Sequence, residues 1–206
     1  GFWYKLVLGL ASSIIGLVLL SVWYKIFYPF PESAGYKTAA TAIFSLFFTA
    51  FDLGTNMCQE RFIAESRIKN PGKMVQYIQY FIWYQMITGL IQTTCVSIYA
   101  LFYVPRSELA YAVWIMLVQS TTQYPGFLGI FRGTLSSMQQ FNKAEILNFV
   151  SGEVFQRITE VLFVLWGRYI LGADPRFGEI LGIAIGSIIG CYVDDFFATW
   201  LAAHYF

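Results

Sequence analysis

The amino-acid sequence predicts an all-α fold, a multi-pass membrane bundle of six transmembrane helices. Of its 206 residues, 57% are hydrophobic and only 12% are charged, against about 25% charged in an average soluble domain. The charged residues are also clustered, which leaves six stretches long enough to cross a hydrocarbon core about 30 Å thick. A soluble bundle of buried helices would need far more charged surface.

The bounds of the six spans follow from the charged clusters. The first span, residues 6–24, is bracketed by Lys5 and Lys25, and the third, residues 74–105, carries no charge. The others are residues 39–61, 109–131, 146–167 and 177–206. Since a spanning helix needs about 20 residues, the whole chain, residues 1–206, is predicted to form one six-helix domain. Pro125 is expected to kink the fourth span.

Regularly spaced glycines in the sixth span predict close helix packing. In the sixth span, small residues recur at every fourth position, a ridge that permits close approach of another helix; they are Gly178, Gly182, Gly186 and Gly190.

With the N-terminus inside, cytoplasmic segments hold seven Lys and Arg residues and the other side holds five. This bias predicts a multi-pass protein of the cell membrane with a cytoplasmic N-terminus.

A narrow polar stripe runs along the second span. At about 100° per residue, its members fall within an arc of roughly 80° on an otherwise apolar helix; they are Thr38, Thr41, Ser45, Thr49, Asp52, Asn56 and Gln59. A wide apolar surface with one polar stripe is expected when lipid surrounds a helix and water or substrate touches one side. The stripe therefore predicts a polar cavity within the membrane.

The fifth span carries four polar residues on one face, Glu153, Gln156, Arg157 and Glu160. A charged group near the bilayer centre costs about 2.5–3.5 kcal/mol on insertion scales, so these side chains must face protein or water. Arg157 can pair with Glu153 at i,i+4 and with Glu160 at i,i+3. Two interpretations stay open: an ion-pair network that holds the helices together, or a site in which Arg157 binds an anionic group of a substrate.

Further polar groups complete the predicted substrate and ion sites. Asp52 and Glu153 each lie roughly 14 Å from the cytoplasmic end of their helices, a depth suited to binding a coupling proton or sodium ion. The sequence does not choose between these ions. Asn56 on the second span and Gln85 on the third are added as candidate substrate contacts.

Several function classes receive no support from the sequence. It contains no CxxC, HExxH, GxSxG, P-loop or GxGxxG pattern, so we expect no catalytic residue, metal site or cofactor and do not expect an enzyme. The net charge of +1 offers no basic surface for nucleic acid.

Short motifs resemble a known family. They are Pro31-Glu32-Ser33-Ala34-Gly35-Tyr36, Phe51-Asp52-Leu53-Gly54, Arg61-Phe62-Ile63-Ala64-Glu65, Gly133-Thr134-Leu135, Gln139-Gln140-Phe141-Asn142-Lys143 with Asn148, and Gly178-Glu179-Ile180-Leu181-Gly182-Ile183. Together they resemble polysaccharide and lipid-linked oligosaccharide flippases of the multidrug/oligosaccharidyl-lipid/polysaccharide exporter superfamily, the later motifs being similar to archaeal members.

The resemblance implies a transporter of two six-helix lobes that alternates access between the membrane faces and flips a polyprenyl-diphosphate-linked oligosaccharide. Cavity arginines of the family contact the diphosphate or acidic sugars, and the matching position is Arg157. The implied partners are the lipid-linked sugar, membrane lipids and a second six-helix lobe, because six spans make only one lobe. That lobe belongs either to a longer chain or to another subunit.

Two other functions remain open. A drug or cation antiporter of the same superfamily would rely on acidic cavity groups such as Asp52 and would need no role for Arg157. A non-transporting membrane subunit would use its polar stripe to meet helices of a partner within a larger complex.

Overall fold

The computed structural model describes residues 2–18, 24–52, 55–123 and 127–204, and within these residues the ordered elements are all helices. The predicted all-α fold is confirmed to that extent. The elements are α1 (Phe2–Val18), α2 (Tyr24–Phe27), α3 (Pro31–Asp52), α4 (Thr55–Lys69), α5 (Pro71–Phe102), the short 3-10 helix η2 (Val104–Arg106), α6 (Ala112–Gln123), α7 (Phe127–Ser137), α8 (Phe141–Phe149), the π-helix η3 (Val150–Phe155), α9 (Gln156–Trp166), the π-helix η4 (Gly167–Leu171) and α10 (Gly178–His204).

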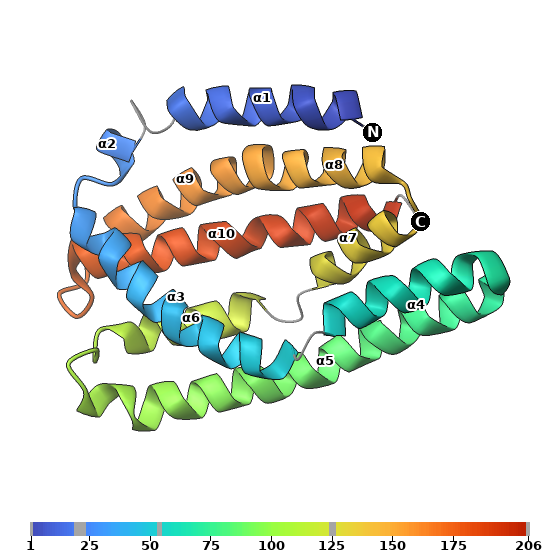
Figure 1. Cartoon of the computed structure of the whole chain (residues 1–206). Helices are drawn as coiled ribbons and strands as arrows, with labels where there is room; N and C mark the ends of the chain where they lie inside the picture. Colours follow the sequence, from blue (N-terminus) through green and yellow to red (C-terminus); the bar gives the residue numbers. More distant parts are fainter. Residues whose placement is uncertain (1, 19–23, 53–54, 124–126, 205–206) are drawn as a thin grey trace.

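The six predicted spans correspond to α1, α3 with α4, α5, α6 with α7, α8 with α9, and α10. Successive members of this series run in alternating directions, and both termini lie at one end of the bundle (Figure 1). Among the described helices, two segments are long and apolar enough to cross a membrane, Pro71–Arg106 and Gly178–His204. This finding points to membrane association without defining six spans.

Helix boundaries differ from the predicted spans where local signals were overlooked. α5 begins at Pro71 rather than at residue 74, because the Asn70 side chain caps it by accepting a hydrogen bond from the Lys73 amide and proline is favoured in the first turn. The second predicted span contains α3, described to Asp52, and α4, described from Thr55; residues 53–54 lie outside the described part. The predicted kink at Pro125 lies outside the described residues.

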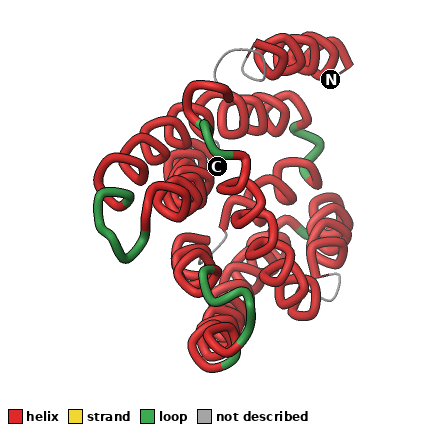
Figure 2. The backbone as a smooth tube through the Cα atoms, turned by 90° about the vertical axis from the view of Figure 1, so that its left-hand side faces the viewer, coloured by secondary structure: helices red, strands yellow, loops and turns green. Residues whose placement is uncertain are grey.

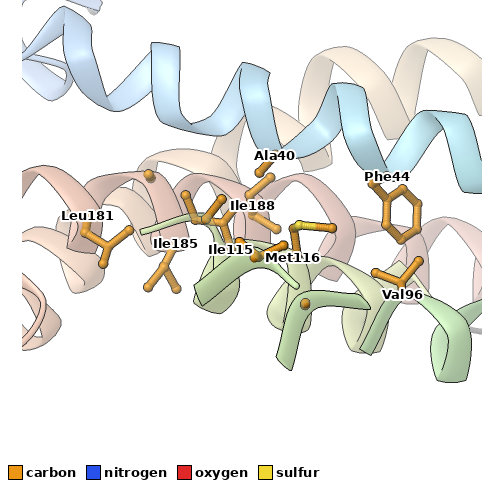
Figure 3. Packing of buried hydrophobic residues seen from close by; sticks show 12 residues of the cluster. Ala40, Phe44, Val96, Ile115, Met116, Leu181, Ile185 and Ile188 are labelled. Atoms are coloured by element: carbon orange, nitrogen blue, oxygen red, sulfur yellow. The ribbon is translucent and has the colours of Figure 1, made fainter. Parts of the chain in front are cut away.

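The main core forms where α3, α5, α6 and α10 meet. Ala40 of α3 points toward Ile188 of α10, and Phe44 of α3 lies beside Met116 of α6 and Val96 of α5 (Figure 3). All five side chains are less than 5% exposed. The apolar side of α3 is therefore the side that faces the rest of this chain.

The glycine ridge of α10 packs against the backbone of α9 and η4. A methyl group built on Gly182 would overlap the carbonyl oxygen of Gly167, and one on Gly186 would overlap that of Phe163. At Gly190 it would lie 2.5 Å from the Glu160 Cα atom. The predicted close packing is confirmed at these three positions, whereas Gly178 has no such neighbour and begins α10 with a φ of +70°.

Helix α1 lies at the edge of the bundle and packs mainly against α8 (Figure 1, Figure 2). Much of its surface is apolar and exposed, with Trp3 73%, Leu10 59% and Ile14 63% exposed. A soluble helix would bury such a face against its own core.

Candidate functional site

The Glu160 carboxylate is the centre of a buried polar network between α3, α9 and α10. Glu160 is only 8% exposed. Its Oε1 atom accepts hydrogen bonds from the Tyr28 hydroxyl at 2.7 Å and from the Ser187 hydroxyl at 3.1 Å. Burial raises the pKa of Tyr28, and the neighbouring Glu160 carboxylate adds to the increase. Tyr28 therefore stays protonated and acts as a donor.

Lys37 brings a positive charge from α3 to the same carboxylate. Its Nζ atom lies 3.5 Å from Glu160 Oε1 and donates to Ser187 Oγ at 2.6 Å and to Cys191 Sγ at 3.1 Å. The Gln156 side chain contacts the same Cys191 thiol. Ser187 and Cys191, one turn apart on α10, thus connect Lys37 of α3 to α9.

Arg157 lies between two carboxylates without a hydrogen bond from its Nε atom. Nε is 3.7 Å from Glu153 Oε2, and Nη1 is 3.7 Å from Glu160 Oε2. These separations are those of ion pairs and exceed the 2.7–3.2 Å typical of N–H···O hydrogen bonds. Both Arg157 Nε and Glu153 Oε2 are buried with no hydrogen-bond partner, yet the Arg157 side chain as a whole is 34% exposed. Part of the Arg157 side chain is therefore accessible from outside the network, although its Nε atom is not.

Glu153 connects the network to a cavity beside α1. The cavity has a volume of about 300 Å³ and is lined by Lys5, Leu8, Gly9, Ser12, Glu145, Asn148, Phe149 and Glu153. Ser12 of α1 donates to Glu153 Oε1 at 2.5 Å, and Lys5 lies 3.8 Å from Glu145. Through Glu153, one carboxylate faces both this cavity and Arg157.

Local backbone geometry places these side chains. The close approach of α10 at Gly190 brings Ser187 within reach of Glu160, and the Thr159 hydroxyl donates to the Gly190 carbonyl at 2.7 Å. Glu153 lies in the π-helix η3, a widened turn of a kind found often at functional sites. The widened turn precedes the regular helix α9 that carries Arg157 and Glu160.

The structure brings together part of the predicted site. Glu153, Gln156, Arg157 and Glu160 share the network, and both predicted ion pairs of Arg157 are confirmed. Gln85 lies on α5, which packs against α3, α4, α6 and α7; no described contact links it to the network. The side chains of Asp52 and Asn56 lie outside those described, so the proposed pairing in depth of Asp52 with Glu153 stays a prediction.

The described members of the polar stripe lie in different environments. Thr38, Ser45 and Thr49 are exposed on α3 and donate to carbonyl groups one turn earlier. Gln59, which continues the stripe in sequence, belongs to α4 and is 3% exposed, and it donates to the Ile130 carbonyl of α7 at 3.1 Å. Thr38, Ser45 and Thr49 thus lie on the surface of this chain, whereas Gln59 makes a packing contact between helices.

Sequence reasoning missed Lys37 and Tyr28. Lys37 precedes the predicted second span, residues 39–61, but α3 begins at Pro31 and contains it. Proline followed by Glu32 is a helix-start signal, and it could have extended the second span far enough to include Lys37. Tyr28 lies between helices, and no sequence signal identifies it as a partner of Glu160.

Comparisons with protein-family models, with curated proteins and with solved structures found no match for this chain.

Proposed function

We propose that this chain is one six-helix lobe of a membrane transporter that flips a polyprenyl-diphosphate-linked oligosaccharide by alternating access. The observation that carries the proposal is Arg157, a partly exposed arginine that lies 3.7 Å from each of two carboxylates and whose Nε atom has no hydrogen-bond partner. A guanidinium presents a rigid fork of donors that matches phosphate oxygens. The flanking carboxylates Glu153 and Glu160 would keep it charged and oriented until a diphosphate displaces one of them.

Exposed aromatic side chains support a membrane setting. The tryptophans whose exposure the structure describes are at least 39% exposed, and they are Trp3, Trp83, Trp114, Trp166 and Trp200. Only 22% of the apolar window in the segment Pro71–Arg106 is buried. A soluble protein rarely exposes so much contiguous apolar surface, whereas membrane lipids would cover it.

The exposed polar side of α3 supports a second lobe. Thr38, Ser45 and Thr49 lie on the side of α3 away from Ala40 and Phe44, which are in the core. In a two-lobed transporter this side would line the space between the lobes and contact water or sugar. A second six-helix lobe, in the same chain or in another subunit, completes the proposed conduit.

The proposed role of Arg157 is tested by photo-cross-linking of a polyprenyl-diphosphate sugar to the purified complete transporter. We expect Arg157→Lys to reduce labelling about tenfold, since an ammonium cannot form the bidentate contact, and Arg157→Met to abolish it. Arg106→Met, at an exposed position of η2, is the control and should label like the parent. Unchanged labelling of Arg157→Met would overturn the assignment.

One observation favours a second candidate, a cation antiporter. The cavity beside α1 contains Glu145 and Glu153 against the single cation Lys5, so its charge suits a cationic ligand better than an anionic one. If Arg157→Met keeps sugar labelling and Glu153→Gln abolishes uptake of an organic cation, this second function replaces the first.

Orientation gives a topological prediction. We propose that residues 61–73 lie in the cytoplasm and residues 105–109 outside, as the distribution of Lys and Arg indicates. In a cysteine-free version, Ser107→Cys should react with an impermeant maleimide added to intact cells, and Ser66→Cys should react only after the membrane is opened. Labelling of Ser66→Cys from outside would reverse the proposed topology.

A further inference from the structure

A second buried charged cluster lies outside the Glu160 network, where α10 meets α7 and η3. Asp194 is 3% exposed, and its Oδ1 atom has no hydrogen-bond partner. Arg132 of α7 also has a buried Nε atom without a partner. The other end of the guanidinium, Nη2, donates to the Ser151 hydroxyl of η3.

The guanidinium of Arg132 therefore has two possible partners on different helices. It acts electrostatically on both Asp194 and Asp195, but among the described ion pairs neither carboxylate lies within 4 Å of it. Arg132 is instead held by a neutral hydroxyl. This arrangement is favoured when Asp194 is uncharged, because a buried carboxylate with an unpartnered oxygen is costly and would attract the guanidinium.

The cluster is connected to the Glu160 network along two routes. Asp194 follows Ser187 by seven residues, so both lie on nearly the same face of α10, about 10 Å apart along its axis. Ser151, which holds Arg132, precedes Glu153 by two residues in the same π-helix. A change of partner by Arg132 would thus act on the helical turn that positions Glu153.

We propose that Asp194 is a proton-binding carboxyl whose protonation state selects the partner of Arg132. With a proton on Asp194, Arg132 donates to Ser151 and η3 is held as described. When the proton leaves for solvent, the O–H bond breaks, the carboxylate becomes charged, and Arg132 moves to it and releases Ser151. Transport coupling through this site rests on the proposed function, but the proton-binding site itself does not.

Few other charged groups act on Asp194. Arg132 faces it from α7, and Asp195 follows it on α10. Other helices contribute neutral groups near this point: Gln119 of α6 donates to Tyr192, and Ala144 and Leu147 of α8 pack near Ala198. Two charged residues lie farther along α10, Lys37 of α3 at Cys191 and Glu160 of α9 at Ser187.

The site is tested by infrared difference spectroscopy of the intact protein in lipid nanodiscs between acidic and alkaline pH. We expect a protonated-carboxyl band that is lost in Asp194→Asn and kept in Asp195→Asn. Asp194→Glu keeps a titrating carboxyl and should shift the band, which serves if the asparagine variant folds poorly. A band unchanged in both Asp194 variants would overturn the proposal.

Two further arms separate this proposal from its alternatives. A band that responds to sodium at constant pH would show a sodium site and overturn the assignment to a proton. In flipping assays, the parent rate should change with pH and the Asp194→Asn rate should not. If sugar flipping is absent altogether while the infrared band still depends on Asp194, the proton site stands and the proposed flippase function fails.

Discussion

Replacing Glu160 by Gln is expected to destabilise the folded protein by about 3–5 kcal/mol, the range found when one partner of a buried ion pair is removed. The substitution keeps the volume but leaves Lys37 and Arg157 with one carboxylate fewer between them. The free energy of unfolding is measured by titration with a denaturing detergent in mixed micelles.

A second substitution separates the charge effect from packing. Adding Lys37→Met to Glu160→Gln removes the excess positive charge and should recover part of the lost stability. Glu108→Gln, at an exposed position before α6, is the matched control and should change stability by less than about 0.5 kcal/mol. A Glu160→Gln protein as stable as the parent would mean that the network carries little energy.

Replacing Gly186 by Ala should lower stability by at least about 3 kcal/mol, at the upper end of overpacking effects. The added methyl group would overlap the Phe163 carbonyl oxygen and lie 2.9 Å from the Phe163 carbonyl carbon. Both are backbone atoms, so relief requires that α9 and α10 move apart. Folded yield and the thermal midpoint in detergent report the effect.

Gly35→Ala is the control for this change. Gly35 lies in α3 and has no atom within 4 Å of a methyl group at that position. Alanine there should leave stability unchanged or raise it by up to about 1 kcal/mol through helix propensity. Equal stability of Gly186→Ala and the parent would contradict the close backbone contact between α9 and α10.

The sequence predicts helices well here because composition and periodicity act locally. Most of the uncharged third span, residues 74–105, lies in α5, and the glycine period of the sixth span identifies the face of α10 that meets α9. Arg157 was paired with its correct partners for the same reason, since contacts at i,i+3 and i,i+4 depend only on helix geometry.

Contacts between helices could not be derived in the same way. Lys37 and Glu160 are 123 residues apart, and their meeting depends on how α3 crosses α9 and α10. The burial of Ile183 could not be derived from the sequence either. It lies between two ridge glycines and would serve as a tolerant comparison position by sequence, yet it is fully buried, so it cannot be replaced without loss.

Asp194 is a second case. A carboxylate near the end of a membrane span is tolerable if it reaches the interface, and no local sequence pattern indicates that this one is buried. In the structure, α10 packs against α7, and the Asp194 carboxyl is buried while Asp195 is only partly so. Burial of this kind depends on the neighbouring helix and has no local signature.

The most direct test of the central claim is flipping of a fluorescent polyprenyl-diphosphate sugar, followed by leaflet accessibility in vesicles that carry the complete transporter. The decisive variant neutralises the whole network with Lys37→Met, Glu153→Gln, Arg157→Met and Glu160→Gln, because groups of similar volume can often replace buried ion pairs without loss of fold. If Arg157 binds the diphosphate, this variant folds and fails to flip. Normal flipping by the folded variant would show that the network is structural and contradict the proposed function of Arg157.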